Sequence, residues 1–202
     1  MNVHSFLKNI MTKRTQILIA AENILADRGF YGFSMHSLAE VANVAAGTIY
    51  RYFPSKEALM QELHQHIRLE AANTIFIGFD ENLLAKQKYD LLWKNCYNAV
   101  LKNPKRLSVI EMLYFMPDVI EDDNLPLLED QNFTPLITFY ADGVKEGLFL
   151  DWQVSALITL SLDSSINLAK KVLRHCFTPQ QHEVDMVREA SWNTILKPPF
   201  KQ

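Results

Sequence analysis

The sequence predicts an all-α protein, with a three-helix N-terminal domain followed by a larger domain of about six helices. Apolar residues recur at helical spacing along most of the chain, and glycine, proline and asparagine interrupt these runs at intervals. No segment shows a convincing strand pattern. With 202 residues, 49% of them hydrophobic, the chain can bury a core in one larger domain or two small ones.

Residues 12–30 predict an amphipathic helix that ends at Gly29. Its apolar residues follow the spacing i, i+3, i+4, i+7 and i+8, which places them on one helix face: Ile17, Ala20, Ala21, Ile24 and Leu25. Glycine is a common stop signal at a helix end. The four residues that follow, Phe30-Tyr-Gly-Phe33, form an aromatic connector that can pack beneath the next two helices.

Residues 34–53 predict two short helices joined by a tight turn, which is the outline of a helix-turn-helix. Ser34 is a good N-cap, because its hydroxyl can accept a hydrogen bond from a free backbone N–H. Asn43 ends the first helix, since asparagine can adopt the left-handed conformation that a helix end favours. The second helix runs from about Ala46 to Tyr52, and Val44 lies in the angle between the two.

The second helix of this pair has no long apolar stripe. It offers a close backbone approach, hydroxyl groups and one guanidinium: Gly47, Thr48, Tyr50, Arg51 and Tyr52. Such groups bind phosphate oxygens and base edges in the major groove of DNA. The alternative is that the two tyrosines are ordinary half-buried aromatics in a short helix pair.

A fourth helix is predicted to begin after Pro54, with Ser55 as its N-cap. Glu57 complements the positive end of the helix dipole, whereas Lys56 opposes it. The unfavourable lysine is explained if its ammonium group binds a DNA phosphate.

Residues 12–60 resemble the DNA-binding domain of the TetR family of one-component transcriptional repressors. The resemblance is carried by an ordered pattern: Gly29-Phe30, Gly32-Phe33-Ser34-Met35, Leu38-Ala39, Ala42, Val44, Gly47-Thr48-Ile49-Tyr50, Tyr52-Phe53 and Ser55-Lys56-Glu57-Ala58-Leu59. It covers about a quarter of the chain. The resemblance implies a fold in which the second helix of the pair enters the major groove.

The resemblance also implies a set of DNA-binding residues: Ser34, Ala46, Gly47, Thr48, Tyr50, Arg51, Tyr52 and Lys56. Within this set, phosphate contacts fall to Gly47, Thr48, Tyr50, Tyr52 and Lys56, and base contacts to Ala46, Thr48 and Arg51. Two residues depart from the family pattern. Ala45 stands where many relatives have a capping serine or threonine, and Asn43 stands where they usually have glycine. The second helix of the pair, which is the recognition helix, is therefore expected to fray more easily without DNA.

Charge divides unevenly between the two parts of the chain. Residues 1–56 hold six Lys/Arg and three Asp/Glu, a net +3, whereas the remainder is net −6. A basic N-terminal part on an acidic body fits a DNA-binding module joined to a domain of another function. We therefore expect an N-terminal extension at 1–11, a DNA-binding domain at 12–56 and a ligand-binding and dimerisation domain at 57–202.

The second part of the chain predicts six helices, at about 55–78, 84–102, 104–116, 126–146, 152–176 and 179–196. Breaks fall at Gly78, Asn103-Pro104, Met116-Pro117, Gly147 and Thr178-Pro179. Thr178 is the expected cap of the last helix, with Pro179 at its first position.

Aromatic and sulfur-containing side chains are frequent in this part, and they predict either a well-filled core or a pocket for an apolar or aromatic small molecule. The candidate ligand-binding residues are His66, Trp93, Tyr97, Met112, Phe115, Phe139 and Tyr140. Polar groups that could orient a ligand occur at Glu111 and at Asp163-Ser-Ser-Ile-Asn167. Each has a simpler explanation, because Glu111 can face solvent, His66 can be a satisfied interface histidine, and the serines can permit close helix approach.

The last two predicted helices carry more apolar surface than one buried face requires, which indicates a second partner. The TetR resemblance implies that this helix pair forms a four-helix bundle across a two-fold axis. The candidate dimer residues are Leu162, Ile166, Ala169, Val187 and Ser191. A two-fold dimer would read a pseudo-palindromic operator.

These features predict a ligand-responsive repressor that a small effector releases from DNA, through a tilt of the long fourth helix. The alternative is an enzyme or small-molecule carrier on a helical fold. No nucleophile-base pair, metal cluster or phosphate-binding glycine loop supports that alternative, so no catalytic residue, metal or cofactor is expected. A gel-shift with DNA from upstream of the gene would separate the two.

The remaining signals concern location and redox chemistry. No export signal or run of eighteen apolar residues is present, so a cytoplasmic protein is expected. Met1 and Met11 are both plausible starts. Cys96 and Cys176 lie in predicted helices without metal-ligand spacing, which favours reduced thiols in or near the core over a redox-sensing pair.

Overall fold

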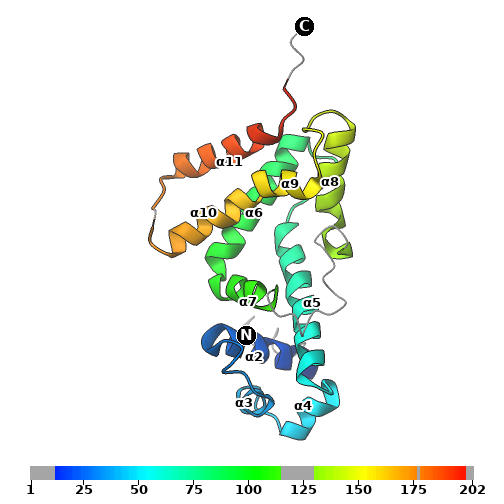
Figure 1. The fold of residues 1–202 in the computed structure, drawn as a ribbon, viewed down its shortest axis with the longest axis vertical. Helices are drawn as coiled ribbons and strands as arrows, with labels where there is room; N and C mark the ends of the chain where they lie inside the picture. The colour runs from blue at the N-terminus through cyan, green and yellow to red at the C-terminus, as the bar shows by residue number, and fades with distance from the viewer. Residues whose placement is uncertain (1–11, 115–129, 177, 199–202) are drawn as a thin grey trace, which may run out of the picture. The chain divides into compact units, whose positions relative to one another are not determined.

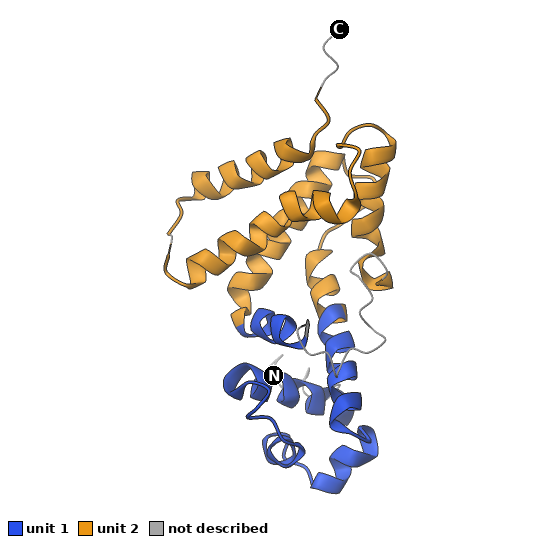
Figure 2. Cartoon of the chain, viewed as in Figure 1, with its two compact units in different colours: residues 1–68, 105–124 blue, residues 69–104, 125–202 orange. Residues whose placement is uncertain are grey.

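The computed structural model describes residues 12–114, 130–176 and 178–198. Within these ranges the chain forms helices and no β-strand, and one isolated antiparallel bridge joins Phe149 to Leu196. The all-α prediction is therefore confirmed. The chain divides into two compact units, the first from residues 1–68 and 105–124 and the second from residues 69–104 and 125–202 (Figure 2).

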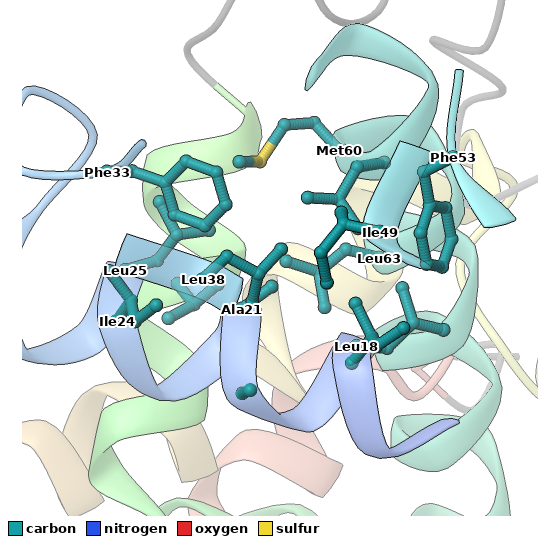
Figure 3. Close-up of a cluster of buried hydrophobic side chains, with 14 of the residues drawn as sticks. Leu18, Ala21, Ile24, Leu25, Phe33, Leu38, Ile49, Phe53, Met60 and Leu63 are labelled. Atoms are coloured by element: carbon teal, nitrogen blue, oxygen red, sulfur yellow. The ribbon is translucent and has the colours of Figure 1, made fainter. Parts of the chain in front are cut away.

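The first unit contains α2 (Lys13–Arg28), α3 (Met35–Val41), α4 (Ala46–Tyr52), the start of α5 (Lys56–Ile75) and nearly all of α7 (Pro104–Tyr114) (Figure 1). Its core is mainly aliphatic, although the aromatic side chains of Phe33 and Phe53 also contribute, and it joins side chains from all five helices. Leu25, Leu38, Ile49, Leu63 and Val109 are fully buried there, and Figure 3 shows the side chains of the first four converging. This packing unit reaches beyond residue 56, because α5 and α7 supply part of its core.

Local helix signals in the first unit are confirmed. The Ser34 hydroxyl accepts a hydrogen bond from the Ser37 backbone N–H at 3.0 Å, which caps α3. Gly29 ends α2 with φ 66°, and Asn43 follows α3 with φ 51°, both in the left-handed region. The Ser55 hydroxyl accepts from the Ala58 N–H at 3.1 Å at the start of α5. By contrast, Ala45 gives α4 no side-chain cap, as the sequence indicates.

The second unit contains the end of α5 together with α6 (Ala85–Lys102), the 3-10 turn η2 (Gln131–Phe133), α8 (Thr134–Lys145), α9 (Val154–Leu160), α10 (Asp163–Leu173) and α11 (Gln181–Ile195). Helix α6 packs against α10 and α11, and α8 packs against α9. Its core is aromatic, since Tyr89, Trp93, Tyr140 and Phe149 are each almost completely buried. Ring contacts connect several of these side chains, including Phe149 with Trp192 at 5.5 Å.

The prediction of one helix over 152–176 is wrong, because α9 ends at Leu160 and α10 begins at Asp163. The buried Ser161 explains the break. Its hydroxyl donates to the Leu157 carbonyl at 2.6 Å and shares a 2.8 Å hydrogen bond with the Tyr140 hydroxyl. A serine that bonds back to its own helix bends it, and here Ser161 leaves regular helix geometry with φ −115° and ψ −74°.

Other helix boundaries also differ from the predictions. The last helix begins at Gln181 and not at Pro179, because Gln180 is the N-cap and its N–H donates to the Glu183 carboxylate at 2.7 Å. Helix α5 ends at Ile75, before Gly78, which has φ 74°. The predicted helix over 126–146 is described only from residue 130, where η2 precedes α8.

The two cysteines occupy different environments, and this gives a test of the second unit. Cys96 is buried, and burial raises the pKa of its thiol to about 12. Cys176 is exposed and lies beyond the end of α10, so the prediction of a helical thiol in or near the core is wrong for this residue. Because the thiolate is the reactive form, Cys176 is expected to react promptly with a thiol reagent at pH 8 and Cys96 only after unfolding. Counting modified thiols with and without guanidinium checks this, with Cys176→Ser as the control. Rapid modification of two thiols in the folded protein would contradict it.

Candidate DNA-binding interface

One side of helix α4 packs on the core of the first unit, and the other side is exposed. Ile49 is fully buried, and Phe53, which caps the C-terminus of α4, is 1% exposed. The outward positions include Ala46, Gly47 and Arg51, which are exposed, and Tyr50, which is 53% exposed. Two side chains therefore fix the helix, while the predicted DNA-binding residues remain accessible.

Gly47 is not required by the packing of the chain itself. A Cβ atom built on Gly47 would meet no atom within 4 Å, and the residue does not have a positive φ. Its lack of a side chain therefore leaves the backbone of α4 open to close approach by an external group.

Arg51 and Tyr52 lie together at the end of α4. The Arg51 guanidinium is 5.3 Å from the centre of the Tyr52 ring, within the range of a cation–π contact. Tyr52 is half-buried, and Thr48, one turn earlier, is also half-buried. An arginine held over an aromatic ring keeps its N–H donors available for base edges or phosphates.

Lys56, at the first turn of α5, is held by the aromatic connector. Its Nζ lies 3.8 Å from the centre of the Phe30 ring, 5.4 Å from that of Phe33, and 3.5 Å from the Phe33 carbonyl oxygen. The sequence indicates the charge but not these contacts, since they join residues more than twenty positions apart. They fix the direction of the lysine side chain at the edge of the helix-turn-helix.

Arg14 is a residue that sequence reasoning missed. Its guanidinium forms a two-bond ion pair with the Glu62 carboxylate and lies 5.0 Å from the centre of the Phe53 ring. It therefore joins α2, the end of α4 and α5. The hydrogen bonds that Arg14 donates to the Glu62 carboxylate raise the pKa of Arg14 and so favour its charged form. Ser34, which is in the predicted set, is exposed but uses its hydroxyl to cap α3.

The predicted ligand-binding residues are divided between the two units. His66 and Met112 are half-buried in the first unit, and Phe115 lies outside the described residues. The other four belong to the aromatic core of the second unit: Trp93, Tyr97, Phe139 and Tyr140. Of these four, Phe139 also lines a cleft of about 530 Å³.

The aromatic side chains of that core have partners within the second unit. The Trp93 indole N–H donates to the Ser164 hydroxyl at 2.8 Å, and Tyr97 stacks on Trp93 with ring centres 5.5 Å apart. The Tyr140 hydroxyl bonds to Ser161. Burial raises the pKa of Asp163, against a hydrogen bond from Thr159 that lowers it. The polar run at 163–167 includes a serine that accepts a hydrogen bond from a buried aromatic side chain, a role that neither explanation drawn from the sequence had named.

Three of the five predicted dimer residues are covered by the chain itself. Leu162, Ala169 and Ser191 are buried, and the Ser191 hydroxyl shares a 2.7 Å hydrogen bond with the buried Tyr89. Ile166 on α10 and Val187 on α11 are half-buried. These two keep apolar surface that a second copy could cover.

In the part of the chain that the structure describes, no group of three His, Cys, Asp or Glu side chains could hold a metal ion. None of the described helices combines the length and apolar character needed to cross a bilayer.

Comparisons with known proteins agree with this arrangement. The family model for bacterial regulatory proteins of the tetR family matches residues 17–63, and the model for the tetracyclin repressor-like C-terminal domain matches residues 85–196. An uncharacterized HTH-type transcriptional regulator of Haemophilus influenzae is 30% identical over 90% of this chain and 95% of its own length. The structure of a TetR-family protein from Vibrio parahaemolyticus is 32% identical over 92% of this chain and 99% of that one, with a TM-score of 0.79. The Bacillus subtilis fatty acid metabolism regulator is 25% identical over 83% of this chain and 80% of its own length.

The two family models and these relatives identify this chain, a helix-turn-helix followed by an all-helical unit, as a DNA-binding transcriptional regulator, which is not an enzyme. The chain belongs to the TetR family.

Proposed function

We propose that this regulator is a repressor that binds a pseudo-palindromic operator as a homodimer, in the cytoplasm, and is released by a small effector with an apolar or aromatic body. The observation that supports DNA binding most directly is α4. Its buried Ile49 fixes the helix, while Gly47, Tyr50 and Arg51 face outward.

In this proposal Arg51 reads bases and Lys56 binds phosphate. Arg51→Ala is expected to relax sequence preference, with a loss of about 1–3 kcal/mol confined to the cognate operator. Lys56→Ala is expected to weaken binding to all sequences and to reduce the salt dependence, because one phosphate contact is lost. Gel-shift titrations at several salt concentrations measure both, using DNA from upstream of the gene and a scrambled duplex. Unchanged affinity and salt slope for Lys56→Ala would contradict the phosphate role.

The dimer contact is proposed on the solvent side of α10 and α11. Ile166 and Val187 are half-buried there, and Met186 on α11 is 65% exposed, so the outer side of these helices keeps apolar surface in contact with water. Association would cover this apolar surface and place two recognition helices on one DNA site. The small positive charge of the N-terminal part fits such a bivalent contact, since each phosphate adds only part of the binding free energy.

Ile166→Glu is expected to convert the dimer to a monomer while the chain stays folded, because the new charge would be desolvated in the contact. Light scattering measures the mass, and circular dichroism measures the helix content. Asn167→Glu, at the neighbouring exposed position, is the matched control and is expected to stay dimeric. A dimer of unchanged mass for Ile166→Glu would move the contact elsewhere. Leu162→Glu is expected to unfold the second unit, since Leu162 is 4% exposed.

Helix α5 is the proposed route between effector and DNA. Residues 56–68 of this helix belong to the first unit and residues 69–75 to the second, and its twenty residues span about 30 Å at 1.5 Å per residue. An effector that binds the DNA-incompetent state more tightly would shift the population toward it. A coupling of about 1–3 kcal/mol corresponds to a 5- to 150-fold loss of operator affinity.

A further inference from the structure

The second unit contains a cleft between the start of α6 and one face of α8. Its volume is about 530 Å³, within the range of small-molecule sites. Apolar side chains from both sides line it, with Phe79, Leu83 and Leu84 before α6 and Phe139 and Leu148 in and after α8. The cleft is separate from the buried contacts of Trp93, Tyr97 and Tyr140, which do not line it.

The charged residues that line the cleft give it a negative balance. Glu81, Asp142 and Glu146 are exposed carboxylates, and Lys88 is the one basic side chain among the lining residues. A positive charge in the cleft would therefore meet an excess of negative charge.

Asp142 and Glu146 occupy positions where their negative charges destabilise the protein when no ligand is bound. They lie four residues apart at the C-terminal end of α8, and the Glu146 N–H donates to the Asp142 carbonyl. Like charges at this spacing repel each other, and negative charges at a helix C-terminus oppose the helix dipole. Both side chains line the cleft, so a bound cation would relieve the repulsion.

Leu84 is a second unfavourable residue at the same cleft. It occupies the N-cap of α6, where serine, threonine, aspartate and asparagine are preferred, and its side chain is 71% exposed. The Gln87 side chain compensates in part by accepting from the Leu84 N–H at 3.0 Å. An exposed leucine here neither caps the helix nor fills the core, but it supplies apolar contact area at the mouth of the cleft.

We propose that this cleft binds an organic cation, a protonated amine or quaternary ammonium on an apolar body. The carboxylates of Asp142 and Glu146 would attract the charge, and Phe79, Leu84 and Phe139 would cover the apolar part. The proposal deepens the proposed function, on which it rests for the link between this ligand and DNA binding.

Three probes built on an eight-carbon chain test the site on the full-length protein: octyltrimethylammonium, octanoate and 1-octanol, each titrated by calorimetry. The cation is expected to bind at least fivefold more tightly than the alcohol, and octanoate more weakly than both. Equal affinities for the cation and the alcohol would overturn the proposal. Binding of octanoate more tightly than the cation would also overturn it. Such a result would instead favour a fatty acid, the class of compound in the name of the Bacillus subtilis relative.

Substitutions locate the bound probe. Glu146→Gln and Asp142→Asn are each expected to weaken the cation two- to fivefold and to leave octanol unchanged, whereas Asp151→Asn, an exposed acid outside the cleft, is expected to change neither. Leu84→Ser is expected to weaken both the cation and the alcohol while the melting temperature stays equal or rises, since serine is the better cap. Cation affinity unaffected by both acid substitutions would overturn the site.

Operator binding is measured separately, by gel-shift with and without octyltrimethylammonium. A protein that binds the cation but no DNA contradicts the proposed function and leaves the site intact. A protein that binds DNA but not the cation contradicts the site alone.

Discussion

Gly143→Ala is expected to destabilise the second unit by about 1–3 kcal/mol or more. A Cβ on Gly143 would lie 2.2 Å from Cδ2 and 2.3 Å from Cε2 of Phe149, much closer than two carbon atoms can approach. Phe149 cannot move aside easily, because it is 1% exposed and its ring contacts Phe139, Tyr140 and Trp192. Overpacking of this kind forces side chains off their rotamers. Chemical denaturation followed by circular dichroism measures the change.

Gly47→Ala is the matched control, since Gly47 is also a helical glycine but has open space around it. Alanine favours helix over glycine by about 0.5–1 kcal/mol, so stability is expected to stay equal or rise. DNA affinity is nevertheless expected to fall about tenfold or more, because the methyl group would stand between the α4 backbone and the phosphates.

If Gly143→Ala proved as stable as the parent, the described contact between α8 and Phe149 would be wrong. Undiminished DNA binding by Gly47→Ala would exclude a close backbone approach.

The local signals of the first unit could be predicted because each depends on neighbouring residues. The Ser34 cap and the Gly29 and Asn43 helix ends are properties of one or two turns of chain, and short-range chemistry determines them. The α4 surface was predictable for the same reason, since helical spacing separates Ile49 from its outward neighbours.

Contacts between residues that are far apart in the sequence could not be predicted from it. The break at Ser161 contains neither glycine nor proline and depends on the Tyr140 hydroxyl, twenty-one residues away. Likewise, the apolar excess on the last helices predicts a partner, but burial shows that the chain itself covers Leu162 and Ala169. The same spacing fits an internal helix contact and a dimer contact, so the pattern alone does not separate them.

Two neighbouring basic residues on α7 are expected to differ sharply in their contribution to stability. Arg106 forms two hydrogen bonds with the Glu22 carboxylate, at 2.8 and 3.2 Å, and Glu22 is buried at 7% exposure. Lys105 pairs with Asp27 at 2.6 Å, but both side chains are more than half exposed. Removal of one partner of a buried pair leaves a charge without compensation, whereas an exposed pair is solvated before and after the change.

Arg106→Ala is therefore expected to destabilise the first unit by about 2–4 kcal/mol, below the full value for a buried pair because the Arg106 side chain is a quarter exposed. Lys105→Ala is expected to change stability by about 0–1 kcal/mol. Denaturant titration of both variants provides the comparison, and the double change Glu22→Gln with Arg106→Ala adds a rescue test, since a neutral side chain at position 22 carries no buried charge. Recovery of part of the lost stability in the double variant would assign the loss to the unpaired Glu22 carboxylate. If the two single variants lost the same stability, the buried ion pair would not be what joins α7 to α2.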